Sequence, residues 1–306
     1  MGFLQKQSIG MEISHGGIAA VLMSERHKIV RMLRTTRVPL SRECLNQSQK
    51  EPQVASPSDF VHVVREAWEN LHCTTRQISL SLPDSAGNLL LMSLQDPWRR
   101  RSDVLELLRW KLGRRLGIDA GQLHLDFQLL ERKPDGSSDL LVALMNRAVI
   151  LQYEELFLEA GLQPTRISFH TPNVLRLVGR ITSDVTQLVT LYDNTLGIMA
   201  QTGGRLAFCR VKTLVHCSGL NERLKHELAA SLAASRQACG KTASYPWHLF
   251  APPDNTNVAA LLTAATGDAP LQVAPDMLFA KCSTLPLTGE QLYQKSAAAG
   301  AALREP

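Results

Sequence analysis

Two short polar turns hold the residues of this sequence whose types and spacing suit chemistry. In the first turn, a carboxylate, a hydroxyl, an imidazole and two glycines lie close together, at Glu12, Ser14, His15, Gly16 and Gly17. The second turn, in the other half of the chain, contains Asp193, Asn194 and Thr195. If the fold places these turns on facing walls of a cleft, Glu12 and Asp193 could together bind Mg²⁺, which prefers oxygen ligands.

No motif of an established catalytic centre accompanies these turns. The sequence has no nucleophile elbow, Walker loop, HExxH or GxGxxG. His15 lacks a paired carboxylate or cysteine and is better explained as a turn residue than as a catalytic base. The six cysteines show no CxxC pair and no metal-like spacing, which indicates reduced, structural thiols. We therefore assign no catalytic residue and no metal site.

Positive charge concentrates on a predicted helix at 102–116 and on the residues before it. The helix carries Arg109, Trp110, Lys111 and Arg114. Two interpretations stay open: these residues dock against an acidic partner or the anionic inner leaflet, or they form a solvated helix face. Nucleic acid is not expected as a partner, because the aromatic residues that would stack on bases make up only 5% of the chain.

The composition is that of a globular protein with about two domains. Hydrophobic residues make up 44% of the 306 positions and charged residues 20%, and the formal net charge is +5. No stretch approaches the ~20 apolar residues of a membrane helix. Residues 1–8 are too short and too polar for a signal peptide. We therefore expect a cytoplasmic protein without a membrane span.

The elements that must position the two polar turns follow a repeated order. Alternating and short apolar runs predict three strands within residues 9–38, and a second three-stranded meander within 188–214. Helical material follows each meander, which suggests an internal duplication. We predict a first lobe at residues 1–183 and a second lobe at 184–306.

A further module interrupts the first lobe. Between about residues 86 and 170, apolar patterns and turn signals predict the order β-α-β-β-α-β, the split βαβ arrangement. Its first helix is expected to stop at Gly117, and its second helix at Gly161, because glycine readily adopts the left-handed conformation that ends helices. The tail at 289–303 is predicted to form one more helix.

This order of elements resembles the actin-like fold, and within it the PilM and MshI proteins of type IV pilus assembly. The likeness is carried by Ile78-Ser-Leu-Ser-Leu-Pro-Asp84, by the helix with Leu108-Arg109-Trp110, and by the spacing through Phe169. It implies an α/β, two-lobed actin-like (ribonuclease H-like) fold with an inserted βαββαβ subdomain. The fourth subdomain would be reduced, since only 215–221 lie between the second meander and the long helix.

Relatives that bind ATP are similar in three loops, and this chain departs from each. The glycine of the first phosphate loop is replaced by Ser14, whose Cβ obstructs the approach of the backbone to phosphate. In the second loop, Thr190 and the bulky Tyr192 occupy the corresponding positions. The third loop, at 251–254, contains two prolines and no glycine. The two polar turns, at 12–17 and 193–195, are therefore expected to form a degenerate nucleotide-binding cleft.

The resemblance implies a non-catalytic scaffold of a type IV pilus or a related secretion system. Its partner would be the cytoplasmic tail of a PilN-like inner-membrane protein, alongside other pilus assembly proteins. Such a partner would recruit the chain to the inner face of the inner membrane. No cofactor is expected. The alternatives are an ATP-binding ATPase of the PilM type that uses Mg²⁺, and a subunit that self-associates into homo-oligomers or filaments.

Overall fold

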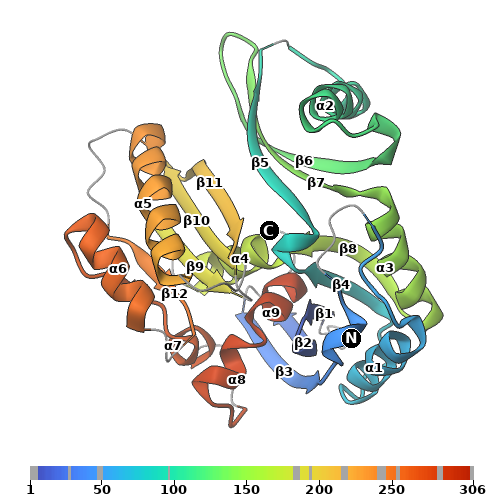
Figure 1. Ribbon diagram of the computed structural model, residues 1–306. Helices are drawn as coiled ribbons and strands as arrows, with labels where there is room; N and C mark the ends of the chain where they lie inside the picture. The colour runs from blue at the N-terminus through green and yellow to red at the C-terminus, as the bar shows by residue number, and fades with distance from the viewer. Residues whose placement is uncertain are drawn as a thin grey trace.

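The computed structural model describes residues 6–26, 29–46, 51–95, 97–181, 187–192, 195–214, 220–239, 246–252, 256–280 and 285–303. Within these residues the chain forms two five-stranded sheets and one three-stranded sheet, each covered by helices (Figure 1). The two larger sheets are the centres of two lobes, and the smaller sheet projects from the first lobe. This arrangement agrees with the two-lobed α/β prediction.

The sheet of the first lobe has the strand order β3-β2-β1-β4-β8. Its strands are β1 (Lys6–Ser14), β2 (Gly17–Arg26), β3 (Ile29–Val38), β4 (Gln77–Leu82) and β8 (Gln163–Phe169). The first three form the predicted antiparallel meander, whereas β4 runs parallel to β1 and β8 parallel to β4. Helices α1 (Pro57–Glu69) and α3 (Arg147–Glu159) cover one face, where Phe60 packs against Tyr153 and Phe157.

The second lobe repeats this plan. Its sheet has the order β11-β10-β9-β12-β13, and β12 runs parallel to β9 as β4 does to β1. The strands are β9 (Gln187–Tyr192), β10 (Thr195–Thr202), β11 (Arg205–Thr213), β12 (His248–Phe250) and β13 (Leu271–Gln272). Helices α5 (Leu220–Cys239) and α6 (Thr256–Thr266) cover one face. Only residues 214–219 connect β11 to α5, which leaves no room for a lid-sized fourth subdomain.

Four helices fill the space between the two sheets. They are α4 (His170–Ile181), α7 (Pro275–Ala280), α8 (Gly289–Tyr293) and α9 (Ser296–Ala302). The predicted single helix at 289–303 is therefore two helices, separated at Gln294 and Lys295. Although α9 belongs to the second lobe by sequence, it packs against α4 and against β1 and β2 of the first. The predicted boundary at 183/184 thus separates the two sheets but not this helix.

Two glycines allow α9 to approach so closely. A Cβ at Gly10 of β1 would overlap the carbonyl oxygen of Ala298, and a Cβ at Gly300 would overlap that of Asn173 in α4. The other residues of α9 are alanines and Ser296, all buried. A helix made of small residues can lie almost against the backbone of the sheet, and this contact fixes the second lobe on the first.

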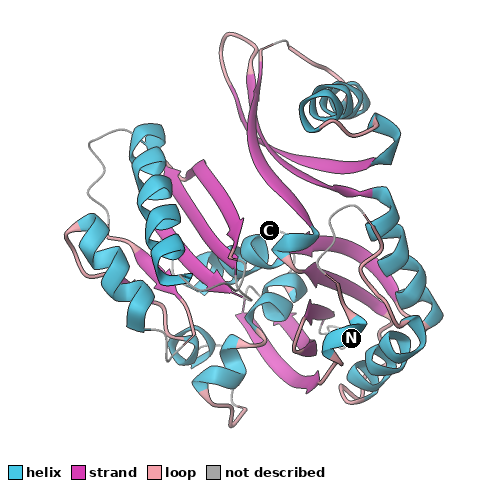
Figure 2. Ribbon diagram, in the orientation of Figure 1, coloured by secondary structure: helices cyan, strands magenta, loops and turns pink. Residues whose placement is uncertain are grey.

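The inserted module contains the predicted elements in the predicted order, but they belong to two sheets (Figure 2). Strands β5 (Gly87–Leu94), β6 (Leu123–Arg132) and β7 (Ser138–Asn146) form an antiparallel sheet with the order β5-β7-β6, and α2 (Arg101–Leu116) covers one face. We call these four elements the insert. Helix α2 ends at Gly117 as predicted, with a left-handed φ of 66°.

The last two elements of the predicted 86–170 module complete the first lobe instead. Val149, Tyr153 and Phe157 are fully buried on α3 and face the core of that lobe. This apolar face packs α3 onto the larger sheet, and β8, which follows it, then pairs with β4 as the outermost strand. The insert therefore ends at Asn146. Among the described residues, no helix is both long enough and apolar enough to span a bilayer.

Candidate functional site

Glu12 lies at the centre of the contact between the lobes. Its side chain is only 3% exposed. One carboxylate oxygen, Oε1, accepts a 2.8 Å hydrogen bond from the hydroxyl of Tyr192 at the end of β9. The other, Oε2, accepts a 3.2 Å bond from the backbone N–H of Ala298 in α9. Both oxygens are thus engaged by other parts of the chain, from the second sheet and from the C-terminal helix.

Tyr192 is held in place by its own neighbours. Its hydroxyl lies 3.1 Å from the carbonyl oxygen of Tyr293, and its ring packs against the rings of His170, Phe250 and Tyr293. Burial raises the pKa of Tyr192 well above its ordinary value, and the nearby Glu12 carboxylate adds to this rise. The hydroxyl therefore keeps its proton and acts as the donor to Glu12.

The first polar turn serves the β1–β2 hairpin. The Ser14 hydroxyl donates a 3.0 Å hydrogen bond to the carbonyl oxygen of Gly17, which closes the turn. Gly17 has a φ of 143°, which favours glycine, and a Cβ at Gly16 would lie 2.5 Å from the guanidinium of Arg37. His15 is half-buried in the same turn. Each glycine therefore has a packing role here.

The actin-like fold implies ATP with Mg²⁺ in the cleft between the lobes, but these residues do not fit that pair. Glu12 would have to give up two hydrogen bonds to approach a hydrated cation, and Tyr192 lies directly beside it. Thr195 is buried at the start of β10, and Asp193 and Asn194 lie outside the described residues. Within the described part of the chain, no group of three His, Cys, Asp or Glu side chains is placed to hold a metal.

A groove runs between the insert and the first lobe. It consists of two hollows of about 290 and 510 Å³, which share His124, Ile150 and Glu154 and so form one depression. The first hollow is lined by α3, by β6 and β7 of the insert, and by residues 164–169 of β8. The second is lined by α3, the start of β6, and the C-terminal half of α2. We call the two hollows together the insert groove.

The insert groove has an apolar floor and a charged rim. Leu123, Ile150 and Phe169 are each less than 10% exposed and form part of the floor. The rim of the second hollow carries Arg109 from α2 and Arg147 from the first turn of α3. Neither arginine forms an ion pair with another residue in the part of the chain that the structure describes. The rim therefore offers unneutralised positive charge from two separate elements.

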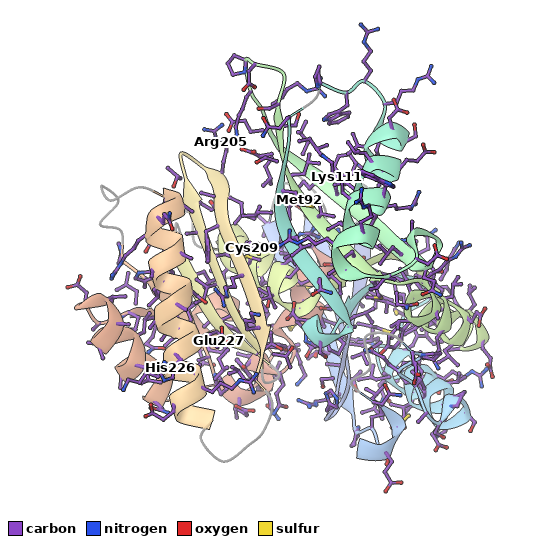
Figure 3. All side chains as sticks on the ribbon, turned by 45° about the horizontal axis from the view of Figure 1, so that its top comes forward. Met92, Lys111, Arg205, Cys209, His226 and Glu227 are labelled. Carbon is purple, nitrogen blue, oxygen red and sulfur yellow. The ribbon has the colours of Figure 1, made fainter. Side chains whose placement is uncertain are left out.

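The predicted basic cluster on α2 is divided between different faces of the helix. Arg109 lines the insert groove, whereas Lys111 lies on the side of Met92 in β5 (Figure 3). Successive helix residues differ by 100°, so Arg109 and Lys111 point in nearly opposite directions. Trp110 is 55% exposed, and the guanidinium of Arg114 lies 5.0 Å from its ring. Of the four residues, only Arg109 contributes to the groove.

Sequence reasoning did not find Arg147 or Leu151, which also line the groove. A signal was nonetheless present. Leu151 and Leu158 fall outside the buried stripe of α3 and are 40% and 59% exposed. An apolar residue on the outer face of an amphipathic helix can mark a contact surface. Only the structure shows that Leu151 borders a hollow and that Leu158 does not.

The insert also touches the second lobe. Strand β11 lies beside β5, and Arg205 at the start of β11 forms an ion pair with Glu131 of β6. On the same strand, Arg210 pairs with Glu227 of α5 at 3.0 Å. Figure 3 shows Arg205 and Cys209 on the side of the second lobe that faces the insert. The insert is therefore in contact with both lobes.

The chain consists of two similar lobes. Each has a three-stranded meander extended by parallel strands and helices on both faces of its sheet, and this arrangement is an actin-like fold. Solved structures agree. A PilM–PilN type IV pilus biogenesis complex contains a chain with a TM-score of 0.79 and 18% identity, over 99% of this chain and 100% of that one. A Bacteroides thetaiotaomicron protein of unknown function with an actin-like ATPase fold has a TM-score of 0.54 and 10% identity, over 89% and 92% of the two chains.

A third similar structure is the cytoplasmic domain of EpsL, an inner-membrane component of the type II secretion system of Vibrio cholerae. Its TM-score is 0.51 at 12% identity, over 96% of this chain and 95% of that one. No protein-family model and no curated protein sequence matches the chain. At these identities the likeness establishes the fold, and the predicted actin-like fold class is confirmed.

Proposed function

We propose that this chain is a non-catalytic scaffold for the assembly of a type IV pilus or a related secretion system. It would hold the short cytoplasmic tail of a PilN-like inner-membrane protein in the insert groove. The observation that carries this proposal is the groove itself, which joins an apolar floor to a charged rim on a fold similar to that of a chain in a PilM–PilN complex. Binding there would recruit a cytoplasmic chain to the inner face of the inner membrane.

The second support for a scaffold is the state of Glu12. A carboxylate bound by Tyr192 and by α9 contributes to the contact between the lobes instead of facing a ligand. The groove lies between the insert and the first lobe, and neither Glu12 nor Tyr192 lines it, so partner binding does not require the cleft between the lobes. The state of Glu12 and the position of the groove therefore both support a role in holding partners over a role in ATP hydrolysis.

Calorimetric titration with a synthetic PilN-type N-terminal tail peptide tests the proposal. We expect saturable binding, and at 100-fold excess over the dissociation constant the peptide should add about 2.7 kcal/mol to the free energy of unfolding. Leu151→Glu should weaken binding, because it places a charge on the lining of the groove. Leu158→Glu is the matched control, since it lies two turns further along the exposed face of α3 and lines neither hollow.

A parallel titration with ATP and Mg²⁺ separates the alternatives. Absence of peptide binding by the unmodified chain would contradict the scaffold. Saturable nucleotide binding with a rise in melting temperature would instead favour the ATPase. Equal weakening by the Leu151 and Leu158 variants would place the peptide elsewhere on α3.

A further inference from the structure

The wall that β8 contributes to the insert groove is the edge of the strand. Residues 164–169 are six consecutive residues, and all of them line the first hollow. Side chains of a strand alternate between the two faces of its sheet, so one face could contribute only every second residue. A run of consecutive lining residues therefore means that the backbone edge itself borders the hollow.

This edge has no strand beside it. In the sheet order β3-β2-β1-β4-β8, β8 is outermost and pairs only with β4 within the described residues. The insert sheet lies across the hollow but is a separate sheet, and no backbone hydrogen bond joins β8 to it among the described residues. An outer strand presents a row of N–H and C=O groups that can pair with another chain.

We propose that the occupant of the insert groove binds as an extended strand that pairs with β8 and lengthens the sheet of the first lobe. This inference rests on the proposed function, because it describes how the partner tail occupies the same groove. Backbone pairing would give an affinity that depends little on the sequence of the bound segment, and the floor of the groove would select among the side chains of that segment. Ile150, 8% exposed and shared by both hollows, offers an apolar contact for one of them.

The charge on the rim specifies the chemistry of the segment. Arg109 and Arg147 come from the insert and from the first lobe, and they meet in the second hollow without an ionic partner among the described residues. Glu154 is the acidic residue that lines the same hollow, so the arginines leave net positive charge there. The strand should therefore carry an acidic side chain where it passes α2 and the start of α3, since arginine binds carboxylates through paired hydrogen bonds.

N-methylation of the peptide backbone tests the strand pairing. A strand added at an edge directs the N–H groups of every second residue toward its neighbour. Two versions of the PilN-type tail peptide, N-methylated at alternate positions, should therefore differ. One series should bind about 10- to 100-fold more weakly than the unmodified peptide, because it loses its backbone hydrogen bonds to β8. The other series should bind nearly as well as the unmodified peptide.

Hydrogen exchange of the intact chain gives a second readout. The bound peptide should slow exchange of backbone amides within residues 163–169. Arg109→Glu and Arg147→Glu should each weaken binding about tenfold or more, whereas Arg114→Glu, an exposed position of the same α2 that lines neither hollow, should not.

The two proposals fail in different ways. If the unmodified peptide does not bind, the proposed function itself is contradicted. If it binds, but both N-methylated series weaken equally and residues 163–169 exchange as before, the strand pairing is overturned while the scaffold stands. If the Arg109 and Arg147 variants bind like the Arg114 control, the acidic character assigned to the segment is wrong.

Discussion

The hydroxyl of Tyr192 donates a 2.8 Å hydrogen bond to the carboxylate of Glu12, and this bond joins the sheets of the two lobes. Glu12 belongs to β1 and Tyr192 is the last residue of β9. Lys295, 5% exposed, lies directly before α9 and close to Glu12. Burial and the nearby Arg37 lower the pKa of Lys295, and the Glu12 carboxylate opposes them only in part. The buried charge of Glu12 persists only because it is hydrogen-bonded and neutralised.

Tyr192→Phe should therefore destabilise the protein substantially. The variant keeps the ring and its aromatic contacts but leaves Glu12 without one donor. Loss of a hydrogen bond to a buried charged group should lower the free energy of unfolding by about 1.5–3 kcal/mol, measured by urea denaturation. The matched control is Tyr153→Phe, because Tyr153 is equally buried but donates to the neutral Oε1 of Gln53 at 2.9 Å.

The control variant should lose only about 1 kcal/mol, since the acceptor that it leaves is uncharged. Equal losses in the two variants would show that the charge on Glu12 adds nothing to the bond between the lobes. An unchanged stability for Tyr192→Phe would contradict the bond altogether.

The close approach of α9 makes a second prediction. Gly300→Ala should lower the free energy of unfolding by about 1–3 kcal/mol or more, because the new methyl group would overlap the backbone carbonyl of Asn173. Gly179→Ala is the matched control. Gly179 lies in α4, is exposed, and has no atom near its would-be Cβ. There the same substitution should stabilise the helix by about 0.5–1 kcal/mol.

Thermal and urea unfolding of the two glycine variants check the opposite signs. If both variants gain stability, the contact between α9 and α4 is looser than the structure shows. If both lose stability, the loss at Gly300 cannot be assigned to the overlap with Asn173 alone.

Local patterns in the sequence predicted most of the elements correctly, because local rules determine them. The meanders follow from apolar runs and polar turns, and the end of α2 follows from Gly117. The same rules could have divided the basic cluster, since 100° per residue already separates Arg109 from Lys111. The insert groove, in contrast, depends on β8 pairing with β4 across some eighty residues of chain. No local pattern distinguishes this pairing from one with the insert.

The site between the lobes shows a similar limit. Glu12 was expected to face Asp193, which lies outside the described residues, and the structure shows that it accepts a hydrogen bond from Tyr192, the residue before it. No local pattern in the sequence indicates that the hydroxyl of Tyr192 reaches the other sheet. The contribution of Ala298 could not be predicted either, because α9 reaches β1 only through the packing of the whole chain.

Two buried tyrosines make stability depend on alkaline pH. Burial raises the pKa of Tyr153, and burial together with Glu12 raises that of Tyr192, whereas a tyrosine in the unfolded chain ionises near its ordinary value of 10. Above that pH the unfolded chain releases protons that the native protein retains. The native state then binds more protons, so the free energy of unfolding falls as pH rises. Lys295, with its lowered pKa, contributes in the opposite direction as pH rises toward its ordinary value of 10.5.

Tyr153→Phe isolates one of these contributions. Above pH 10 the stability of the unmodified protein should fall more steeply than that of the variant, by up to about 1.4 kcal/mol per pH unit, because the variant has one fewer group that titrates only on unfolding. The variant should start about 1 kcal/mol less stable at pH 8, through the lost bond to Gln53, and this deficit should shrink as the pH rises. Urea denaturation at pH 8 and at pH 11 measures both values. A deficit that stays constant between the two pH values would mean that Tyr153 ionises as readily in the native protein as in the unfolded chain.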